Sequence, residues 1–344
     1  MHSHWLYAHH MVRFTVLASG SKGNSTVVTG GRTRILVDAG LSCRELLRRM
    51  KLAGEEPETL NAIVITHEHQ DHINGLAVTA RRLGIPVYFT EGTHRAWMRW
   101  LTPRRQMTYA QWLEQCRKQA AERQAEAEAA QFDAEGEAEE VDVLVESGPV
   151  SPEIAPIPVS DTADPPPSAP APSKDPTWLP SVEYFQAGQP FEIGDIAISP
   201  FTIPHDAADP VGFTFRAEGI KIAIATDLGY LPASVRDQLR GCDLLVLESN
   251  HDVEMLRVGS YPWSVKQRVM SRVGHLSNSA LAEFFVTEYD GHASYIVLAH
   301  LSEENNHPEL ARSAAEKALS GRRTLLHNRV MLAAQTEAMQ PIRF

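Results

Sequence analysis

The stretch Thr66-His67-Glu68-His69-Gln70-Asp71-His72 directly follows residues 60–65, an apolar run rich in branched side chains. The run predicts a short buried strand, so the polar stretch falls on the loop at its end. Imidazole and carboxylate groups suit zinc and comparable first-row ions, and a His-x-His spacing lets two rings converge on one ion. The stretch therefore predicts the metal site of a hydrolase, and Asp71 and His72 extend it toward a second ion.

Strand-like and helix-like segments alternate through most of the chain. Apolar runs predict strands at 12–18, 26–28, 34–38, 62–66, 86–89, 191–193, 196–203, 212–217, 221–226, 244–248 and 295–299. Helices are predicted at 44–50, 75–83, 231–239, 277–287 and 308–318. Two strand-rich halves with outer helices favour an α/β fold of the αββα four-layer type, although this spacing alone also permits two separate domains.

Further candidate ligands stand at the ends of three later predicted strands. They are His205, Asp227 and His300. Each alone could be a cap or turn residue, but four strand ends with the same chemistry indicate one crevice lined by ligands. Asp38 closes an earlier strand, where a carboxylate can orient a ligand histidine. Together these residues favour a metal site over a solvated polar loop with chance histidines.

The acidity of the chain belongs to one segment. The net charge is −11, and residues 111–180 alone hold 15 Asp and Glu against 4 Lys and Arg, a net of −11. An Ala/Glu/Gln-rich part, 111–140, predicts a polar helix, and 149–180 contains 11 of the 22 prolines. Such composition buries too little surface to offset its ordering entropy. We expect a partly disordered insertion, open to a protein partner, in a single domain of residues 12–110 and 181–344.

Length and composition indicate a globular protein. A chain of 344 residues with 43% hydrophobic content can bury a large core. Its three cysteines, Cys43, Cys116 and Cys242, form no closely spaced pair, so a reducing cytoplasm is the expected location. No stretch approaches 18 apolar residues, and residues 1–11 are predicted to be a disordered extension, not an export signal. No membrane partner is expected.

This chain resembles the metallo-β-lactamase superfamily of hydrolases. The residues that match the ligand pattern of the superfamily, in the same order along the chain, are Asp38, His67, His69, Asp71, His72, His205, Asp227 and His300. The resemblance covers all but the insertion and the N-terminal extension. It implies one divalent ion, Zn or Mn, on His67, His69 and His205. It implies a second on Asp71, His72 and His300, with Asp227 and an attacking hydroxide bridging the two.

Six motifs narrow the resemblance: LASGSKGNS at 17–25, HDAADPVG at 205–212, ESNHD at 248–252, YPW at 261–263, GHLSN at 274–278 and LSEENN at 301–306. They look like the bacterial YycJ group, also called WalJ. This group comprises predicted nucleases or phosphodiesterases and is related to RNase Z and to the cyclic phosphodiesterase PhnP. The acidic insertion departs from the group's compact form, which leaves regulation and partner contacts open.

The segment Gly274-His275-Leu276-Ser277-Asn278 contains a candidate proton donor. A histidine is protonated near neutral pH, so His275 suits the leaving oxygen of a phosphodiester. Ser277 and Asn278 open a predicted helix whose free backbone N–H groups could receive a phosphate. The alternative is that Ser277 only caps the helix and His275 packs beside it. His251 and Asp252 are weaker candidates for the wall of the substrate site.

A nucleic-acid substrate also needs positive charge and stacking surfaces near the crevice. Candidate bases lie in two groups: Arg95, Arg99, Arg104 and Arg105, and Arg257, Lys266, Arg268 and Arg272. Tryptophans among them could stack on nucleotides: Trp97, Trp100 and Trp263. Solvated arginines on helices and buried tryptophans are the ordinary alternatives.

The sequence thus predicts a cytoplasmic hydrolase with two divalent ions that cleaves phosphodiesters, with a DNA or RNA exonuclease favoured. In this mechanism Asp71 helps to hold or deprotonate the attacking water, and His275 protonates the leaving group. The first alternative is a small-molecule hydrolase on the same site, acting on a cyclic nucleotide or a thioester. The second is a non-enzymatic metal-binding scaffold that recruits a partner through its insertion. The oligomeric state stays open.

Overall fold

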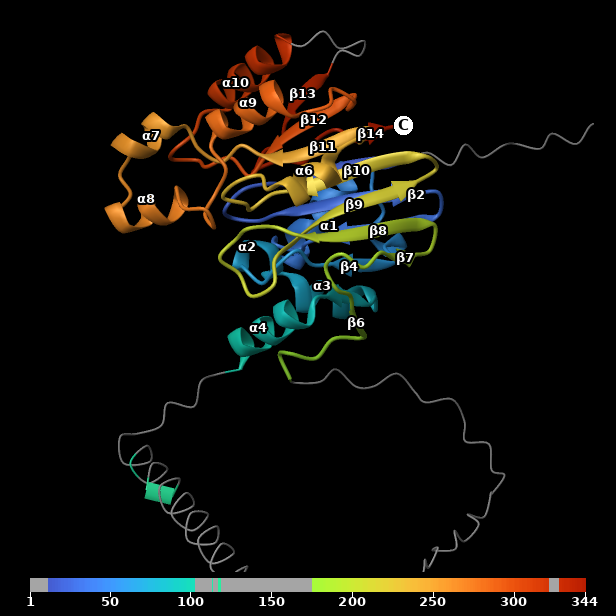
Figure 1. The fold of residues 1–344 in the computed structure, drawn as a ribbon. Helices are drawn as coiled ribbons and strands as arrows, with labels where there is room; N and C mark the ends of the chain where they lie inside the picture. Colours follow the sequence, from blue (N-terminus) through green and yellow to red (C-terminus); the bar gives the residue numbers. More distant parts are fainter. Residues whose placement is uncertain (1–11, 103–112, 114–116, 119–174, 322–327) are drawn as a thin grey trace, which may run out of the picture. The chain divides into compact units, whose positions relative to one another are not determined.

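Two seven-stranded sheets form the centre of the fold in the computed structural model, which describes residues 12–102, 113, 117–118, 175–321 and 328–344 (Figure 1). The strand order of the first sheet is β14 (Ile342–Arg343), β1 (Arg13–Ala18), β2 (Ser25–Gly30), β3 (Thr33–Val37), β4 (Ala62–Val64), β5 (Val87–Phe89), β6 (Val182–Tyr184). That of the second is β13 (Arg329–Leu332), β12 (Tyr295–Ala299), β11 (Leu244–Glu248), β10 (Ile220–Ala225), β9 (Val211–Ala217), β8 (Ile196–Thr202), β7 (Phe191–Ile193).

An apolar layer between the two sheets forms the central core. Phe14 and Ile35 from the first sheet and Phe213 and Phe215 from the second are among its buried side chains. Because the central strands are covered on both faces, every residue of β2 and of β11 is buried. Strands buried in this way carry apolar residues in continuous runs, which is why the sequence predicted them.

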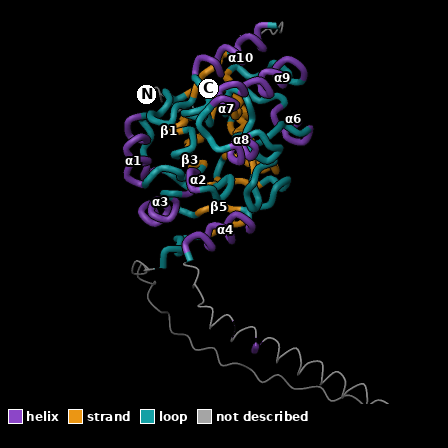
Figure 2. Tube along the Cα trace, turned by 90° about the vertical axis from the view of Figure 1, so that its left-hand side faces the viewer, coloured by secondary structure: helices purple, strands orange, loops and turns teal. Residues whose placement is uncertain are grey.

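Helices cover the outer face of each sheet (Figures 1 and 2). On the first sheet these are α1 (Cys43–Leu52), α3 (Leu76–Leu83) and α4 (Glu91–Leu101), which bury Leu46, Leu76 and Trp97. On the second they are α6 (Ala233–Leu239), α9 (Asn278–Thr287) and α10 (Pro308–Ser320). The predicted αββα four-layer sandwich is therefore confirmed. The short elements η1 (Pro57–Thr59), α2 (Gln70–Ile73), α7 (Val253–Val258) and α8 (Trp263–Val269) lie in the connections.

Parallel strands dominate the part of each sheet that leads to the candidate ligands. Strands β3 to β6 are parallel in the first sheet, and β10 to β13 are parallel in the second. The carboxyl ends of parallel strands meet at one edge, where a crevice can form. The fold thereby brings together side chains that are far apart in the sequence.

Several elements were not predicted. Strands β6, β13 and β14 have two to four residues each, too few for a periodic pattern, and they lie at sheet edges. The N-terminal extension and most of the predicted insertion, including its proposed helix at 111–140, lie outside the described residues. The last part of the predicted insertion contacts the folded domain, since Arg81 donates to the carbonyl oxygens of Asp175, Pro176 and Trp178.

None of the helices in the described part of the chain is long and apolar enough to cross a bilayer.

Candidate metal centre

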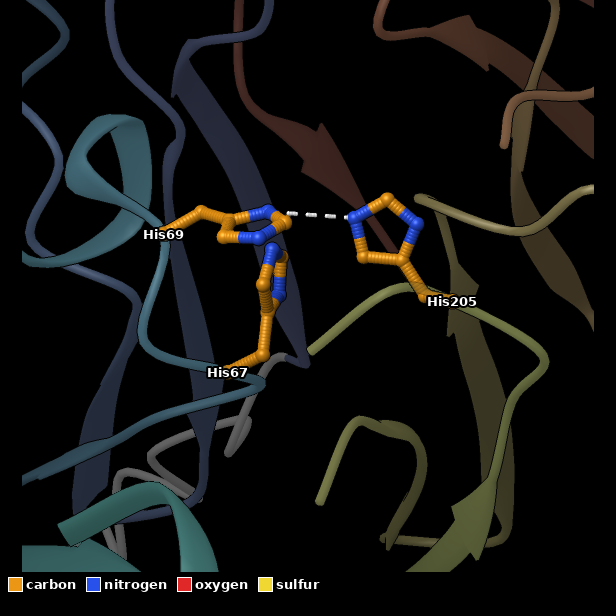
Figure 3. A group of neighbouring side chains, drawn as sticks. All are labelled: His67, His69 and His205. Carbon is orange, nitrogen blue, oxygen red and sulfur yellow. Dashed lines mark hydrogen bonds between the residues drawn. The ribbon is translucent and has the colours of Figure 1, made fainter. Parts of the chain in front are cut away.

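Three imidazoles form the first group of candidate ligands (Figure 3). His67 and His69 come from the loop between β4 and α2, and His205 comes from the loop after β8. Their ligand atoms all lie within 4.8 Å of one another, and His205 Nε2 is 3.1 Å from His69 Nδ1. His67 Nε2 is buried without a hydrogen-bond partner. The three residues that the sequence predicts as ligands of one ion therefore lie close enough together to share it.

The second group contains Asp71, His72, Asp227 and His300. Asp227 Oδ2 is 3.4 Å from His72 Nε2, and Asp71 Oδ2 is 3.4 Å from His300 Nε2. Both Asp227 Oδ2 and His300 Nε2 are buried without a hydrogen-bond partner. Four side chains from α2 and from the ends of β10 and β12 thus meet at one point.

The two groups fit divalent metal ions. Buried polar atoms nearly always have partners, so three orphaned ligand atoms in one crevice indicate a bound group. Burial lowers the pKa of His67, which keeps its ring in the neutral form that binds metals. Burial would also lower the pKa of His300, but Asp227 and neighbouring carboxylates outweigh it and raise this pKa. A cation would neutralise this excess of carboxylate charge.

Backbone strain marks the same strand ends. Asp38, Asp227 and His300 follow β3, β10 and β12 with φ angles of 59°, 61° and 54°. Residues with side chains seldom adopt this left-handed region, and such conformations gather at functional sites. Three of the four residues other than glycine with positive φ in the described chain are thus candidate site residues.

A second layer of polar groups orients the candidate ligands. Asp38 accepts from the backbone N–H and hydroxyl of Thr66 and lies 2.8 Å from His72 Nδ1. This is the geometry of a carboxylate that turns a histidine toward a metal. The backbone N–H of His300 donates to Ser19 Oγ over 2.8 Å. Asp38 lies where the sequence predicts an orienting carboxylate.

The loop 20–25 supports the second group of candidate ligands. Asn24 Nδ2 donates to Asp71 Oδ2 over 3.0 Å and lies 3.0 Å from His72 Nε2, and its backbone N–H donates to the Asp71 carbonyl. Gly40 packs beneath it, since a Cβ there would lie 1.7 Å from that carbonyl oxygen. Sequence reasoning missed Asn24 because the motif is rich in ordinary turn residues.

An Asn24→Ala variant should therefore bind metal about 10- to 100-fold more weakly at the group that contains Asp71 and His72, as expected for loss of a ligand-orienting contact. Competition against a chelating dye measures this affinity. Ser21→Ala, an exposed serine of the same loop, is the matched control. Wild-type affinity in Asn24→Ala would contradict the supporting role of the amide.

Glu248 is the main functional candidate that the sequence did not single out. Its Oε1 lies 2.7 Å from His275 Nδ1 and 2.9 Å from His300 Nδ1. Its Oε2 accepts from the backbone N–H groups of Leu228 and Leu276. These four contacts use both oxygens, so Glu248 fits an orienting carboxylate better than a direct ligand.

His275 lies between the two candidate metal groups. Its ring centroid is 5.2 Å from that of His205 and 5.2 Å from that of His300. Burial alone would lower the pKa of His275, but the Glu248 carboxylate outweighs it and raises this pKa. Burial would raise the pKa of Glu248, but His275 and His300 lower it to about 2. The pair is therefore suited to hold a proton beside the ligands.

Of the four residues predicted to contact the substrate near His275, two are buried and two cap helices. Asn278 is buried and bonds Ser249 Oγ and Asn306 Oδ1, so its side chain is not available to a substrate. Ser277 caps α9, as the competing interpretation of a capping residue requires, and Asp252 caps α7. His251 is buried too, and burial lowers its pKa to about 4.

The candidate basic residues and tryptophans differ in their exposure to solvent. Lys266 is buried and donates to the carbonyl oxygens of Arg257 and Gly259, so its charge serves the fold. Trp97 is core, whereas Trp100 and Trp263 are exposed. Arg104 and Arg105 lie outside the described residues.

Comparison with known proteins agrees with this geometry. Residues 18–250 match the family described as the metallo-beta-lactamase superfamily. The chain belongs to this superfamily. The metallo-beta-lactamase superfamily relatives of this chain include Exodeoxyribonuclease YycJ of Bacillus anthracis, 31% identical over 90% of this chain and 89% of that protein. Exodeoxyribonuclease WalJ of Streptococcus pneumoniae is 30% identical over 87% of this chain and 85% of its own length.

Among solved structures of the metallo-beta-lactamase fold, YhfI from Bacillus subtilis is similar to this chain. Its TM-score is 0.55 at 15% identity, and the match covers 96% of this chain and 99% of that one. This likeness supports the fold alone. The predicted family, its YycJ/WalJ branch and its hydrolase class are confirmed by the sequence matches.

Proposed function

We propose that this superfamily member is a two-metal phosphodiesterase that acts on nucleic acid as an exonuclease. The observation that carries this proposal is the pairing of His275 with Glu248 beside both ligand groups, because phosphodiester cleavage needs a proton donor as well as metals. The names of two relatives, both exodeoxyribonucleases, support a DNA substrate.

The residues of the two groups would hold the ions. His67, His69 and His205 offer three nitrogens, a set that suits Zn²⁺, and the oxygen-richer second group also suits Mn²⁺. Asp227 lies beside His72 and His300 and would offer its carboxylate to an ion in the second group, and the family resemblance implies that it would be shared with the first. When bound, two such ions supply an acidified water and charge stabilisation at the attacked phosphorus.

The side chains of this protein would handle the protons. Asp71 is half-buried and its Oδ2 is held by Asn24, so its carboxylate can orient or deprotonate a water at the crevice. His275 donates a proton to the leaving oxygen, and the nearby Glu248 stabilises its charged form. Glu248 acts through His275 and is a positioning residue.

Turnover assays with metal analysis test the proposal. The purified protein should contain up to two equivalents of Zn or Mn and should shorten 5′-labelled DNA or RNA from one end, with a rate that falls as salt rises. Single- and double-stranded forms of both nucleic acids reveal the preferred substrate. Asp71→Ala should slow the reaction, and a chelator should stop it.

Two experimental outcomes would contradict this proposal and favour another function. Turnover of cyclic phosphodiesters or thioesters, with no cleavage of any oligonucleotide, would favour a small-molecule hydrolase on the same site. A protein that stays inactive on every substrate when Zn or Mn is supplied would favour a metal-binding scaffold.

A further inference from the structure

Residues 253–273, named here the α7–α8 arm, carry an unusual surface. Six of the twelve exposed large hydrophobic side chains in the described residues fall in this short segment: Val253, Val258, Trp263, Val265, Met270 and Val273. Trp263 is 62% exposed. Figure 1 shows α7 and α8 set off from the sheets, and both helices face the viewer in Figure 2. Concentrated exposed apolar surface of this kind marks an interaction site.

The α7–α8 arm is held in a fixed shape. The buried Lys266 Nζ donates to the carbonyl oxygens of Arg257 and Gly259 over 2.9 and 2.7 Å, which ties α8 to the end of α7. Gly259 packs on Asn305, since a Cβ there would lie 2.4 Å from Asn305 Oδ1. The exposed side chains therefore belong to a preformed surface, and binding through it costs little ordering entropy.

Both ends of the arm attach to loops that carry candidate metal ligands. At its end, the Val273 carbonyl accepts from Asp206 N–H over 3.1 Å, and the next carbonyl, that of Gly274, lies 3.3 Å from His205 Nδ1. Arg268 also pairs with Asp206. At its start, Asp252 N–H donates to the Asn305 carbonyl, in the loop that follows His300. The arm thus borders the crevice where a scissile phosphate would bind.

The charge of the arm is opposite to that of the whole chain. It contains one acid, Glu254, and four bases, of which Lys266 is buried, a net of +3, whereas the protein carries −11. The side chains of Arg257 and Arg268 are 69% and 60% exposed and form surface ion pairs with Glu254 and Asp206. Arg272 lies 4.3 Å above the ring of Tyr230. Exposed arginines and an exposed aromatic ring in one short segment complement a polyanion with stacking faces.

We propose that the α7–α8 arm binds the single-stranded part of a nucleic-acid substrate beside the scissile phosphate, with a base stacked on Trp263 and phosphates near Arg257. This inference rests on the proposed phosphodiesterase function and names the surface that selects a long strand over a small diester. A second protein chain is the competing occupant of such an apolar surface.

Strand binding by Trp263→Ala tests the proposal. Fluorescence anisotropy with a labelled phosphorothioate 12-mer of deoxythymidine should show about 5- to 100-fold weaker binding than wild type, the range for loss of one base–aromatic stack. Leu52→Ala is the control, because Leu52 is a large hydrophobic side chain that is 72% exposed but lies on α1, outside the arm. It should bind like wild type. Thermal melting of each variant checks folding.

Three further results discriminate between the explanations. Wild-type affinity in Trp263→Ala overturns the proposal. A changed oligomeric state of Trp263→Ala, measured by light scattering, with unchanged strand binding overturns it too and identifies a protein–protein surface. Weakened binding in Trp263→Ala, with a wild type that cleaves no labelled DNA or RNA in Zn or Mn, supports the arm as a strand-binding surface while the proposed function fails.

Discussion

Hydrolysis by a His69→Ala variant should fall by at least roughly a thousandfold, because Lewis-acid stabilisation by a metal ion contributes several kcal/mol and each 1.4 kcal/mol is worth a factor of ten. His69 is half-buried, one of three imidazoles whose ligand atoms lie within 4.8 Å of one another. Its removal leaves two nitrogens, too few to retain a divalent ion. Elemental analysis should show a loss of up to one equivalent of metal.

Gln70→Ala is the control for His69→Ala. Gln70 is the next residue along the chain, at the start of α2, but its side chain is exposed and belongs to neither ligand group. We expect wild-type metal content and turnover in this variant. Full metal content together with full activity in His69→Ala would exclude the first group as a metal site. Circular dichroism of both variants shows whether the fold persists.

A Glu248→Gln variant should lose roughly 10²- to 10⁴-fold in turnover, the usual contribution of general acid catalysis. The carboxylate is fully buried and contacts His275 Nδ1 and His300 Nδ1. In the proposed mechanism His275 acts in its protonated form, so turnover should fall as pH rises through its pKa. Since Glu248 raises that pKa, its neutralisation should move the alkaline limb of the pH–rate profile to lower pH.

The pH profile separates an effect of Glu248 on the pKa of His275 from a purely structural role. Glu248→Ala should also lower the free energy of unfolding by about 3–5 kcal/mol, the usual effect of removing one partner of a buried charge pair. Urea unfolding measures this loss. Glu316→Gln, an exposed helix residue near Arg312, should change neither stability nor profile appreciably. An unshifted alkaline limb in Glu248→Gln would refute the role assigned to His275.

Local patterns were enough to predict the fold class. The continuous apolar run of β11 is predicted within its observed bounds because a strand covered on both faces needs such a run. The two-residue β14 has no such signal, and only its pairing with β1 through Phe14 and Ile342 creates a strand. The short helices α7 and α8 were missed as well, since neither reaches two full turns.

The candidate ligands were predictable for a different reason. His67, His69 and His72 crowd into one loop, and His205 and His300 each follow an apolar run. Glu248 had no comparable signal, because a glutamate that closes a strand is common and its four partners come from three distant segments. Asn24 also had no distinct sequence signal, because it lies within a motif of ordinary turn residues.

The sequence by itself therefore determined the family, the four-layer fold and the set of candidate metal ligands, because periodicity and ligand chemistry are local properties of the chain. Only the tertiary structure decided which side chains act in pairs. It places Glu248 in contact with His275 and Asn24 in contact with Asp71. It also buries the side chains of Asn278 and Lys266 in hydrogen bonds within the protein, so they are not available to a substrate. Hydrogen bonds and exposure depend on distances between segments, and those distances arise only when the two sheets pack together.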